Sequence, residues 1–380
     1  MGSTPSSGTI LFPLTAVFPG RSIGVGWMAS KVYFAGFEAE ETEESICDKT
    51  RRLFRKAGLR SVVKRGAVAA VKTHFGEEGN VSYVPPAFVK VVVDEVRAAG
   101  GRPCLVETST LYGGQRHNAL DHFNLAVEHG FGPEAMGCPL MFLDGLRGNQ
   151  HVEQPVDLKH CKTVAVAADF TLIPSAVVVT HLTGHLLAGV GGAIKNVAMG
   201  LCSRAGKLRQ HSDGRPSIRA SRCTACGTCA KWCPEDAITV TDKAQIDYGR
   251  CIGCGECLAV CPADAVGFSW DASPVTFNET MAEYAYGILQ DKKVGFITYI
   301  YRTTRDCNCM GTKGKAVCPD LGLLASTDAV AIDQAAVDLV NKAHGRDLFE
   351  EMWPGKQYTA QFVHGEEIGL GSRQYELVTV

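Results

Sequence analysis

The sequence has almost no net charge and no long hydrophobic run, and these two absences exclude several classes of protein. Its 38 lysine and arginine residues are balanced by 40 aspartate and glutamate residues, which gives a formal net charge of −2. General nucleic-acid binding usually requires a strongly basic surface, so we expect no nucleic-acid partner. No stretch approaches the roughly 18 consecutive apolar residues of a transmembrane helix, so we expect no membrane span.

The first 27 residues lack the features of a secretory signal peptide. They contain one charged residue, Arg21, and three prolines, without a basic start or an unbroken apolar core. Met28 then begins a segment that is typical of a strand. We therefore predict that residues 1–27 are an extension that is not part of the fold.

The common nucleotide-binding motifs are also absent. No G-x-G-x-x-G follows a predicted strand with an acidic residue about 20 positions later, and no G-x4-G-K-[ST] is present. A flavin or nicotinamide site is therefore not expected. Any redox chemistry of this chain has to use bound iron, another metal or an external reductant.

Strand-like and helix-like segments alternate over most of the chain. The patterns predict strands at 68–74, 103–107, 176–181 and 294–301, and helices at 39–57, 88–99, 117–129, 281–290 and 329–343. This alternation predicts an α/β fold with a mostly parallel, helix-covered sheet. A cysteine-rich stretch interrupts it, so we predict a discontinuous host domain (28–218 and 269–380) with an α+β insert at 219–268.

Eight of the sixteen cysteines lie in this insert, in two runs of the same spacing. The run from Cys223 to Pro234 has the pattern C-x2-C-x2-C-x3-C-P, and the run from Cys251 to Pro262 repeats it. In this pattern three cysteines of each run bind one [4Fe–4S] cluster and the fourth binds the other cluster. The predicted ligands are Cys223, Cys226, Cys229 and Cys261 for the first cluster, and Cys251, Cys254, Cys257 and Cys233 for the second.

The insert resembles a bacterial-type ferredoxin with two clusters. The residues after the runs repeat as well, as Pro-Glu-Asp-Ala-Ile (234–238) and Pro-Ala-Asp-Ala-Val (262–266). The alternative, two structural zinc sites, usually needs only pairs of C-x2-C. We therefore predict two [4Fe–4S] clusters that transfer single electrons. Thiolates bound to metal rather than paired as disulfides indicate a reducing, cytoplasmic compartment.

The chain from about Lys31 resembles domain-of-unknown-function family 362, whose members are described as uncharacterised iron–sulfur proteins. The stretches that carry the resemblance are 71–77, 111–117, 181–185, 191–200, 203–207 and 325–334. Asn308 stands between two cysteines where the family is expected to have aspartate, and Thr183 stands where a lysine is expected. The resemblance implies the architecture and the iron–sulfur content, but it assigns no reaction.

A group of candidate site residues follows the apolar strand at 176–181. His181 and His185 lie at its carboxyl end, where open α/β sheets bind ligands, and they are candidates for ligand binding or proton transfer. The glycine-rich loop behind them predicts an anion site formed by Gly191, Gly192, Lys195 and Asn196. This region is similar to the histidine and Gly-Gly-x-Lys region of the lactate racemase N-terminal domain. The alternatives are glycines required by close packing and histidines that only hydrogen-bond within their loop.

Two further groups complete the candidates. His74 and Glu77 lie in a loop after a strand, so we count them with His181, His185 and Lys195 as catalytic candidates, against a capping or solvated role. Cys307 and Cys309, with Cys318 nearby, predict an additional metal site. A redox-active thiol pair and buried structural thiols are the alternatives.

Three functions fit these features. The first is an iron–sulfur oxidoreductase whose two clusters deliver single electrons to a site in the host domain. The second is a non-catalytic electron carrier or activating partner of another redox protein. The third is a metal- or cluster-handling protein that uses Cys307 and Cys309. The sequence leaves open whether the chain is an enzyme, and whether its partner is a redox protein or a small-molecule substrate.

Overall fold

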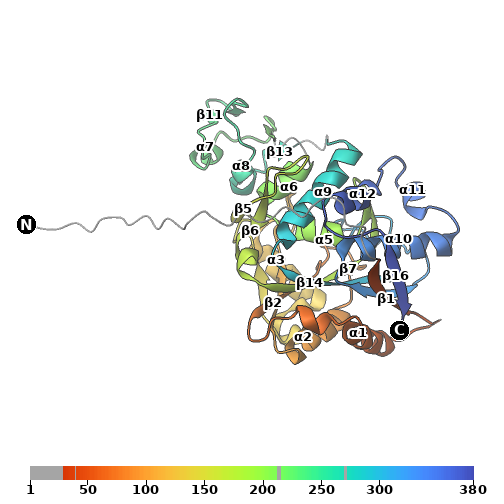
Figure 1. Ribbon diagram of the computed structural model, residues 1–380. Helices are drawn as coiled ribbons and strands as arrows, with labels where there is room; N and C mark the ends of the chain where they lie inside the picture. The colour runs from red at the N-terminus through yellow and green to blue at the C-terminus, as the bar shows by residue number, and fades with distance from the viewer. Residues whose placement is uncertain (1–28, 39, 212–214, 269–271) are drawn as a thin grey trace, which may run out of the picture.

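The structure is a computed structural model that describes residues 29–38, 40–211, 215–268 and 272–380. The predicted extension at 1–27 lies outside the described residues. Figure 1 shows a body built on one large sheet with helices on its two sides. None of the helices in the described ranges has the length and apolar character that crossing a membrane requires.

The central sheet has eight strands in the order β16-β1-β15-β14-β7-β2-β3-β4. The strands from β14 to β4 run parallel to one another, as do β1 and β16, whereas β15 is antiparallel to both of its neighbours. The predicted mostly parallel sheet is therefore confirmed. The strands are β1 (Ser30–Gly36), β2 (Val68–Lys72), β3 (Arg102–Glu107), β4 (Leu140–Phe142), β7 (Ser175–His181), β14 (Lys293–Ile300), β15 (Gly322–Ser326) and β16 (Tyr375–Thr379).

Each face of this sheet has its own hydrophobic core. Val177 and Val179 of β7 belong to one core and Val178 to the other, because successive side chains of a strand point to opposite faces. The first core contains side chains of α1 (Glu43–Lys56) and α2 (Pro86–Ala98). The second contains side chains of α5 (Ala193–Gly200), α9 (Pro274–Leu289), α10 (Ala329–His344), α11 (Leu348–Met352) and α12 (Ala360–Glu367).

Shorter elements connect these layers. They are α3 (Ala119–Ala126), a π-helical turn (Val127–Phe131), α4 (Pro133–Met136), α6 (Arg204–His211), two 3-10 helices (Leu59–Val62, Ala168–Leu172), and the small strands β5 (His151–Pro155), β6 (Thr163–Ala167), β8 (Thr183–His185) and β9 (Gly189–Gly191). The strand pairs β5–β6 and β8–β9 are antiparallel hairpins outside the main sheet.

Several helices begin at other residues than predicted, because capping side chains set where they start. Helix α1 begins at Glu43 rather than at 39, since the hydroxyl of Thr42 accepts the N–H of Ser45. Helix α9 begins at Pro274, seven residues before the predicted start, behind the capping hydroxyl of Ser273. Helix α10 begins at Ala329, as predicted, because the carboxylate of the N-cap residue Asp328 accepts N–H groups of its first turn.

The cysteine-rich stretch forms a set of small elements with a separate core. It contains β10 (Pro216–Ile218), α7 (Thr228–Lys231), β11 (Ile238–Val240), β12 (Ala244–Ile246), α8 (Glu256–Val260) and β13 (Val266–Phe268). Strand β10 pairs with β13, β11 pairs with β12, and both pairs are antiparallel. The sequence repeat recurs in the backbone: Gly227 and Gly255 precede the two short helices with φ of 75° and 76°. Figure 1 shows this stretch at the edge of the molecule.

Candidate functional site

A cavity of about 460 Å³ lies beside the carboxyl ends of β2 and β3, the edge where parallel sheets bind ligands. Its wall is built from the loops after these strands, from α5 and α6, and from the segment 306–310. Its charged and titratable lining residues are Lys72, His74, Glu107, Tyr112, Arg116, His185, Lys195, Lys207, His211, Asp306, Cys307 and Cys309.

A buried ion pair forms the floor of this cavity. The Nζ of Lys72, the last residue of β2, lies 2.5 Å from Oε1 of Glu107, the last residue of β3, although not along a hydrogen-bond direction. Lys72 donates instead to the side-chain oxygen of Asn196 at 2.8 Å. Burial is the largest effect on Lys72 and lowers its pKa, while the nearby Glu107 opposes this change.

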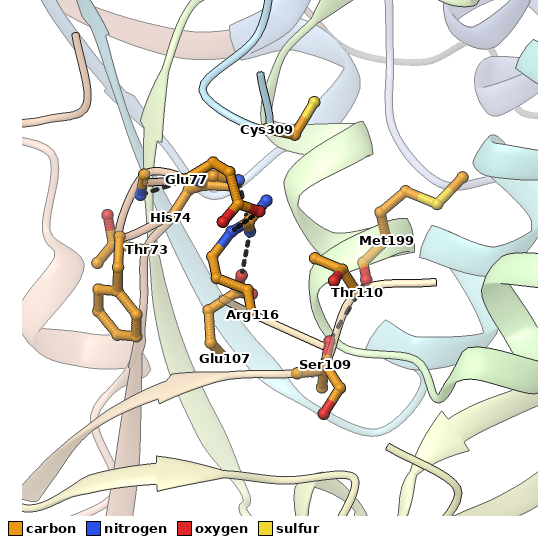
Figure 2. A network of polar contacts seen from close by, with 12 residues as sticks. Thr73, His74, Glu77, Glu107, Ser109, Thr110, Arg116, Met199 and Cys309 are labelled. Atoms are coloured by element: carbon orange, nitrogen blue, oxygen red, sulfur yellow. Dashed lines mark hydrogen bonds and ion pairs between the residues drawn. The ribbon is translucent and has the colours of Figure 1, made fainter. Parts of the chain in front are cut away.

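Arg116 joins the two candidate residues of the 71–77 stretch into one network. Its side chain is 2% exposed. It donates to Oε2 of Glu77 at 3.1 Å, contacts Nε2 of His74 at 3.0 Å, and donates to the hydroxyl of Tyr112 at 2.6 Å. Figure 2 shows Arg116 between this group and Glu107. Burial, with the Arg116 charge added, lowers the pKa of His74 well below its usual value, so this ring is neutral.

Lys195 reaches the same cavity from α5 and has no anionic partner. Among the described residues no carboxylate lies within ion-pair distance of the Nζ of Lys195, and no group accepts a hydrogen bond from this Nζ. Burial lowers the pKa of Lys195 to about 8, and the charges of Arg116 and Lys72 act in the same direction. The carboxylate of Glu107 partly opposes these effects on the pKa of Lys195.

Two N–H groups that directly follow the glycine loop are already occupied by a protein carboxylate. The carboxylate of Asp333, on α10, accepts the N–H groups of Ala193 at 2.7 Å and Ile194 at 2.9 Å, at the start of α5. A Cβ atom at Gly192 would lie 2.4 Å from this carboxylate, so the close approach requires glycine. Of the four residues predicted to bind an anion, Lys195 and Asn196 line the cavity, and Asn196 also accepts from Lys72. Gly192 packs against Asp333, and Gly191 pairs with Thr183 in the β8–β9 hairpin.

The two histidines of the 181–185 stretch differ in their surroundings. Both ring nitrogens of His181 are engaged, with Oδ1 of Asn308 at 3.0 Å and the carbonyl oxygen of Tyr301 at 2.7 Å. His185 lines the cavity, and its Nδ1 accepts the N–H of Ala188 at 2.9 Å. Burial, with the charge of Lys195 added, lowers the pKa of His185 well below its usual value. The neutral ring of His185 therefore carries its proton on Nε2.

His185 lies next to Cys307 and Cys309. Among the described residues, these three form the group of histidine, cysteine and carboxylate side chains whose ligand atoms, within 4.8 Å of one another, could hold a metal ion. The sulfur atoms of Cys307 and Cys309 are joined as a disulfide, so metal binding requires its reduction. Cys318, the third predicted thiol, lies apart and packs at the edge of the second core.

The eight cysteines of the two runs surround two small hollows in the cysteine-rich stretch. One hollow is lined by Cys223, Cys226, Cys229 and Cys261, and the other by Cys233, Cys251, Cys254 and Cys257.

Backbone N–H groups point at sulfur atoms of these two groups. The N–H of Ala237 donates to Sγ of Cys233, and the N–H of Ala265 donates to Sγ of Cys261, both at 3.2 Å. A hydrogen bond from the N–H of Ala244 lowers the pKa of Cys223, which favours the thiolate. The donor set therefore fits two clusters of four thiolates each.

Helix α6 separates the second hollow from the cavity. Lys207 and His211, one turn apart, line the cavity. On another side of the helix, a Cβ at Gly255 would lie 3.6 Å from Cα of Ala205, and Gly255 follows directly after Cys254. The side-chain amide of Asn149 also donates to Glu256 at 3.0 Å. Helix α6 therefore contacts both the cavity and the loop that lines the second hollow.

The sequence interpretation missed several charged or titratable residues of the cavity, among them Lys72, Glu107 and Lys207. Lys72 and Glu107 end apolar strands, and a charged residue at the carboxyl end of a buried strand was the signal that could have found them. Lys207 lies on α6, and its buried Nζ donates to Thr108 at 2.8 Å and to the carbonyl oxygen of Cys202 at 2.7 Å.

The family described as "Domain of unknown function (DUF362)" matches residues 68–338 of the chain. Among solved structures, the lactate racemase apoprotein from Thermoanaerobacterium thermosaccharolyticum is similar, with 10% identity and a TM-score of 0.46, over 83% of this chain and 57% of that chain. A protein from Thermotoga maritima is similar with 11% identity and a TM-score of 0.41, over 80% of this chain and 59% of that chain. The chain thus spans less than two thirds of either structure. Among curated proteins none matches the chain.

Proposed function

The chain belongs to the DUF362 family, and we propose that it is an iron–sulfur redox enzyme. In this proposal the stretch 219–268 is a ferredoxin-like insert that binds two [4Fe–4S] clusters, and the host domain (28–218 and 269–380) binds the molecule that is reduced or oxidised in its cavity. When bound, the clusters supply one-electron transfer. The cysteine groups support the cofactor, since each hollow is lined by the four cysteines that the crossed ligand pattern requires.

The position of α6 is the observation that carries the enzymatic part of the proposal. One face of α6 lines the cavity with Lys207 and His211, and Ala205 packs against the loop that presents Cys254. The rate of electron transfer falls steeply with distance, so a cluster separated from a ligand by one helix is well placed to exchange electrons with it. A carrier without a substrate has no need for a large cavity at this position.

The cavity residues support the binding of the ligand in such a reaction. Arg116, Lys72 and Lys195 make the cavity positive, which favours a ligand that is negative or becomes negative on reduction. The neutral ring of His185 presents a proton at Nε2, and the hydroxyl of Tyr112 is held by Arg116. These groups are the candidates for donating hydrogen bonds to a ligand that becomes negative on reduction.

The first test is anaerobic iron and sulfide analysis of the purified protein, with EPR spectroscopy after dithionite reduction. We expect about eight irons and eight sulfides per chain and a reduced spectrum with coupling between two clusters. Two zinc ions in place of iron would contradict the cofactor. Full iron content, with EPR signals that no ligand of the cavity perturbs, would instead favour the carrier.

A specific observation supports each of the two alternative functions. The exposed side chains of Trp232 and Ile252, next to Cys233 and Cys251, fit the docking of a redox partner, which a non-catalytic carrier or activating protein would need. The group of His185, Cys307 and Cys309 fits a metal- or cluster-handling protein. Zinc, nickel or iron bound beyond the eight irons would favour this third function over the other two.

A further inference from the structure

We propose that the cavity binds an organic monocarboxylate with an apolar body, and that the carboxylate of this ligand pairs with the ammonium group of Lys195. The inference deepens the proposed function by naming its substrate class. It depends on that function only in treating the cavity as the reaction site.

The charge balance of the cavity calls for an anion. Four cationic side chains line it (Lys72, Arg116, Lys195 and Lys207), against the carboxylates of Glu107 and Asp306. Glu107 pairs with Lys72, and Glu77, from behind the wall, pairs with Arg116. Lys207 donates to Thr108 and to the carbonyl oxygen of Cys202, whereas Lys195, which is partly buried, has neither a counter-ion nor a hydrogen-bond partner for its Nζ among the described residues. An unpaired charge that has lost part of its contact with water is costly. An anionic ligand would remove this cost.

The donors that remain fit a carboxylate better than a phosphate. Phosphate sites usually combine several backbone N–H groups at a helix start or a bidentate arginine. Here Asp333 already accepts the N–H groups of Ala193 and Ile194, and Arg116 is held by Glu77 and Tyr112. Lys195 is a single ammonium group, which suits the single negative charge of a carboxylate.

The rest of the cavity wall is mostly apolar, and this determines the chemistry of the ligand beyond its carboxylate. Leu111, Leu186, Leu187, Met199 and Met310 line the cavity, and Leu186 is 49% exposed. A volume of about 460 Å³ lies within the roughly 300–1,000 Å³ of small-molecule pockets. A ligand that fills this space and covers the exposed leucine and methionine side chains has an apolar body beside its carboxylate.

The test is isothermal titration calorimetry of the full-length protein with three probes of similar shape. These are 3-phenylpropanoate, the uncharged 3-phenylpropanamide, and phenyl phosphate. We expect 3-phenylpropanoate to bind at least about tenfold more tightly than the amide, since a charge-assisted hydrogen bond contributes about that much. Equal binding of acid and amide would overturn the inference, and so would tighter binding of phenyl phosphate. This comparison needs no variant.

The second arm uses Lys195→Met, which shortens the side chain by one atom and removes its charge. It should weaken the binding of 3-phenylpropanoate by about tenfold or more and leave that of the amide unchanged. Lys162→Met is the matched control, because Lys162 is 81% exposed in an ion pair with Asp157. Unchanged carboxylate binding in Lys195→Met would overturn the inference. Binding does not need electrons, so the iron analysis above tests the proposed function separately.

Discussion

The carboxylate of Asp333 accepts the backbone N–H of Ala193 at 2.7 Å, across 140 positions of the chain. This contact joins α10 to the first turn of α5. Asp333 thereby occupies two N–H groups next to the glycine loop, where the sequence predicted a bound anion. The protein itself therefore supplies the acidic group at the N-terminus of α5, where the helix dipole favours a negative charge. The same helix then directs Lys195 into the cavity, where a foreign anion can reach it.

Asp333 should make the stability of the fold depend on pH. Burial raises the pKa of Asp333 to about 7, against the hydrogen bonds from Ile194 and Ala193. Between about pH 4 and pH 7 the folded chain holds a proton that the unfolded chain has lost, so this group contributes stability at low pH that is lost as the pH rises to 7. Asp333→Asn should flatten this dependence in urea unfolding at pH 5 to 8, by up to about 1.4 kcal/mol per pH unit. Asp94→Asn, at an exposed carboxylate, should keep the slope of the original protein.

Glu107→Gln should destabilise the fold strongly, by about 3–5 kcal/mol, because it leaves the fully buried Lys72 without its carboxylate. Urea unfolding would measure this change. Adding Lys72→Met to the variant should restore part of the loss, since it removes the unpaired charge. The control is Asp157→Asn in the exposed pair with Lys162, which should change stability by less than about 1 kcal/mol. Equal effects of the two single variants would contradict the role of the buried pair.

Reduction of the disulfide should allow His185, Cys307 and Cys309 to bind one metal ion. Co²⁺ is a suitable probe, because its thiolate complexes absorb in the near ultraviolet, and the iron content should be measured before and after the titration. Binding should release the thiol protons of Cys307 and Cys309, because the thiolate is the metal ligand, whereas His185 binds as a neutral ring and loses no proton. Cys309→Ser should weaken Co²⁺ binding by more than about tenfold, whereas Cys318→Ser should not. No absorbance change in the reduced protein would rule out the site.

Cys226→Ser and Cys254→Ser should each remove or damage one cluster and lower iron and sulfide to about half. The α/β host should remain folded, since the core around Cys229 and Cys257 is separate from the two cores of the sheet. Iron analysis, circular dichroism and thermal unfolding would check this, with Cys47→Ser, outside the cysteine-rich stretch, as the control. Loss of the whole fold in either variant would disprove a separate insert.

The sequence determined the features that depend on neighbours along the chain. The spacing of the eight cysteines is local, and it divides them into the same two groups of four that line the two hollows. The alternation of strands and helices is also local, and it predicted the mostly parallel sheet. The cap at Asp328 likewise depends only on the residues that follow it. The sequence also placed the candidates His74 and His185 in loops after apolar strands, and both residues line the cavity.

Only the tertiary structure decided which distant residues meet. Lys72 reaches Glu107, and Cys307 reaches His185, because the strand order places their segments at one edge of the sheet. The same order brings Asp333 to α5 and sets α6 between the cysteines and the cavity. A hydrophobic pattern fixes which face of a strand is buried, but the partners of a charged side chain at the strand's end depend on how the crossover connections pack.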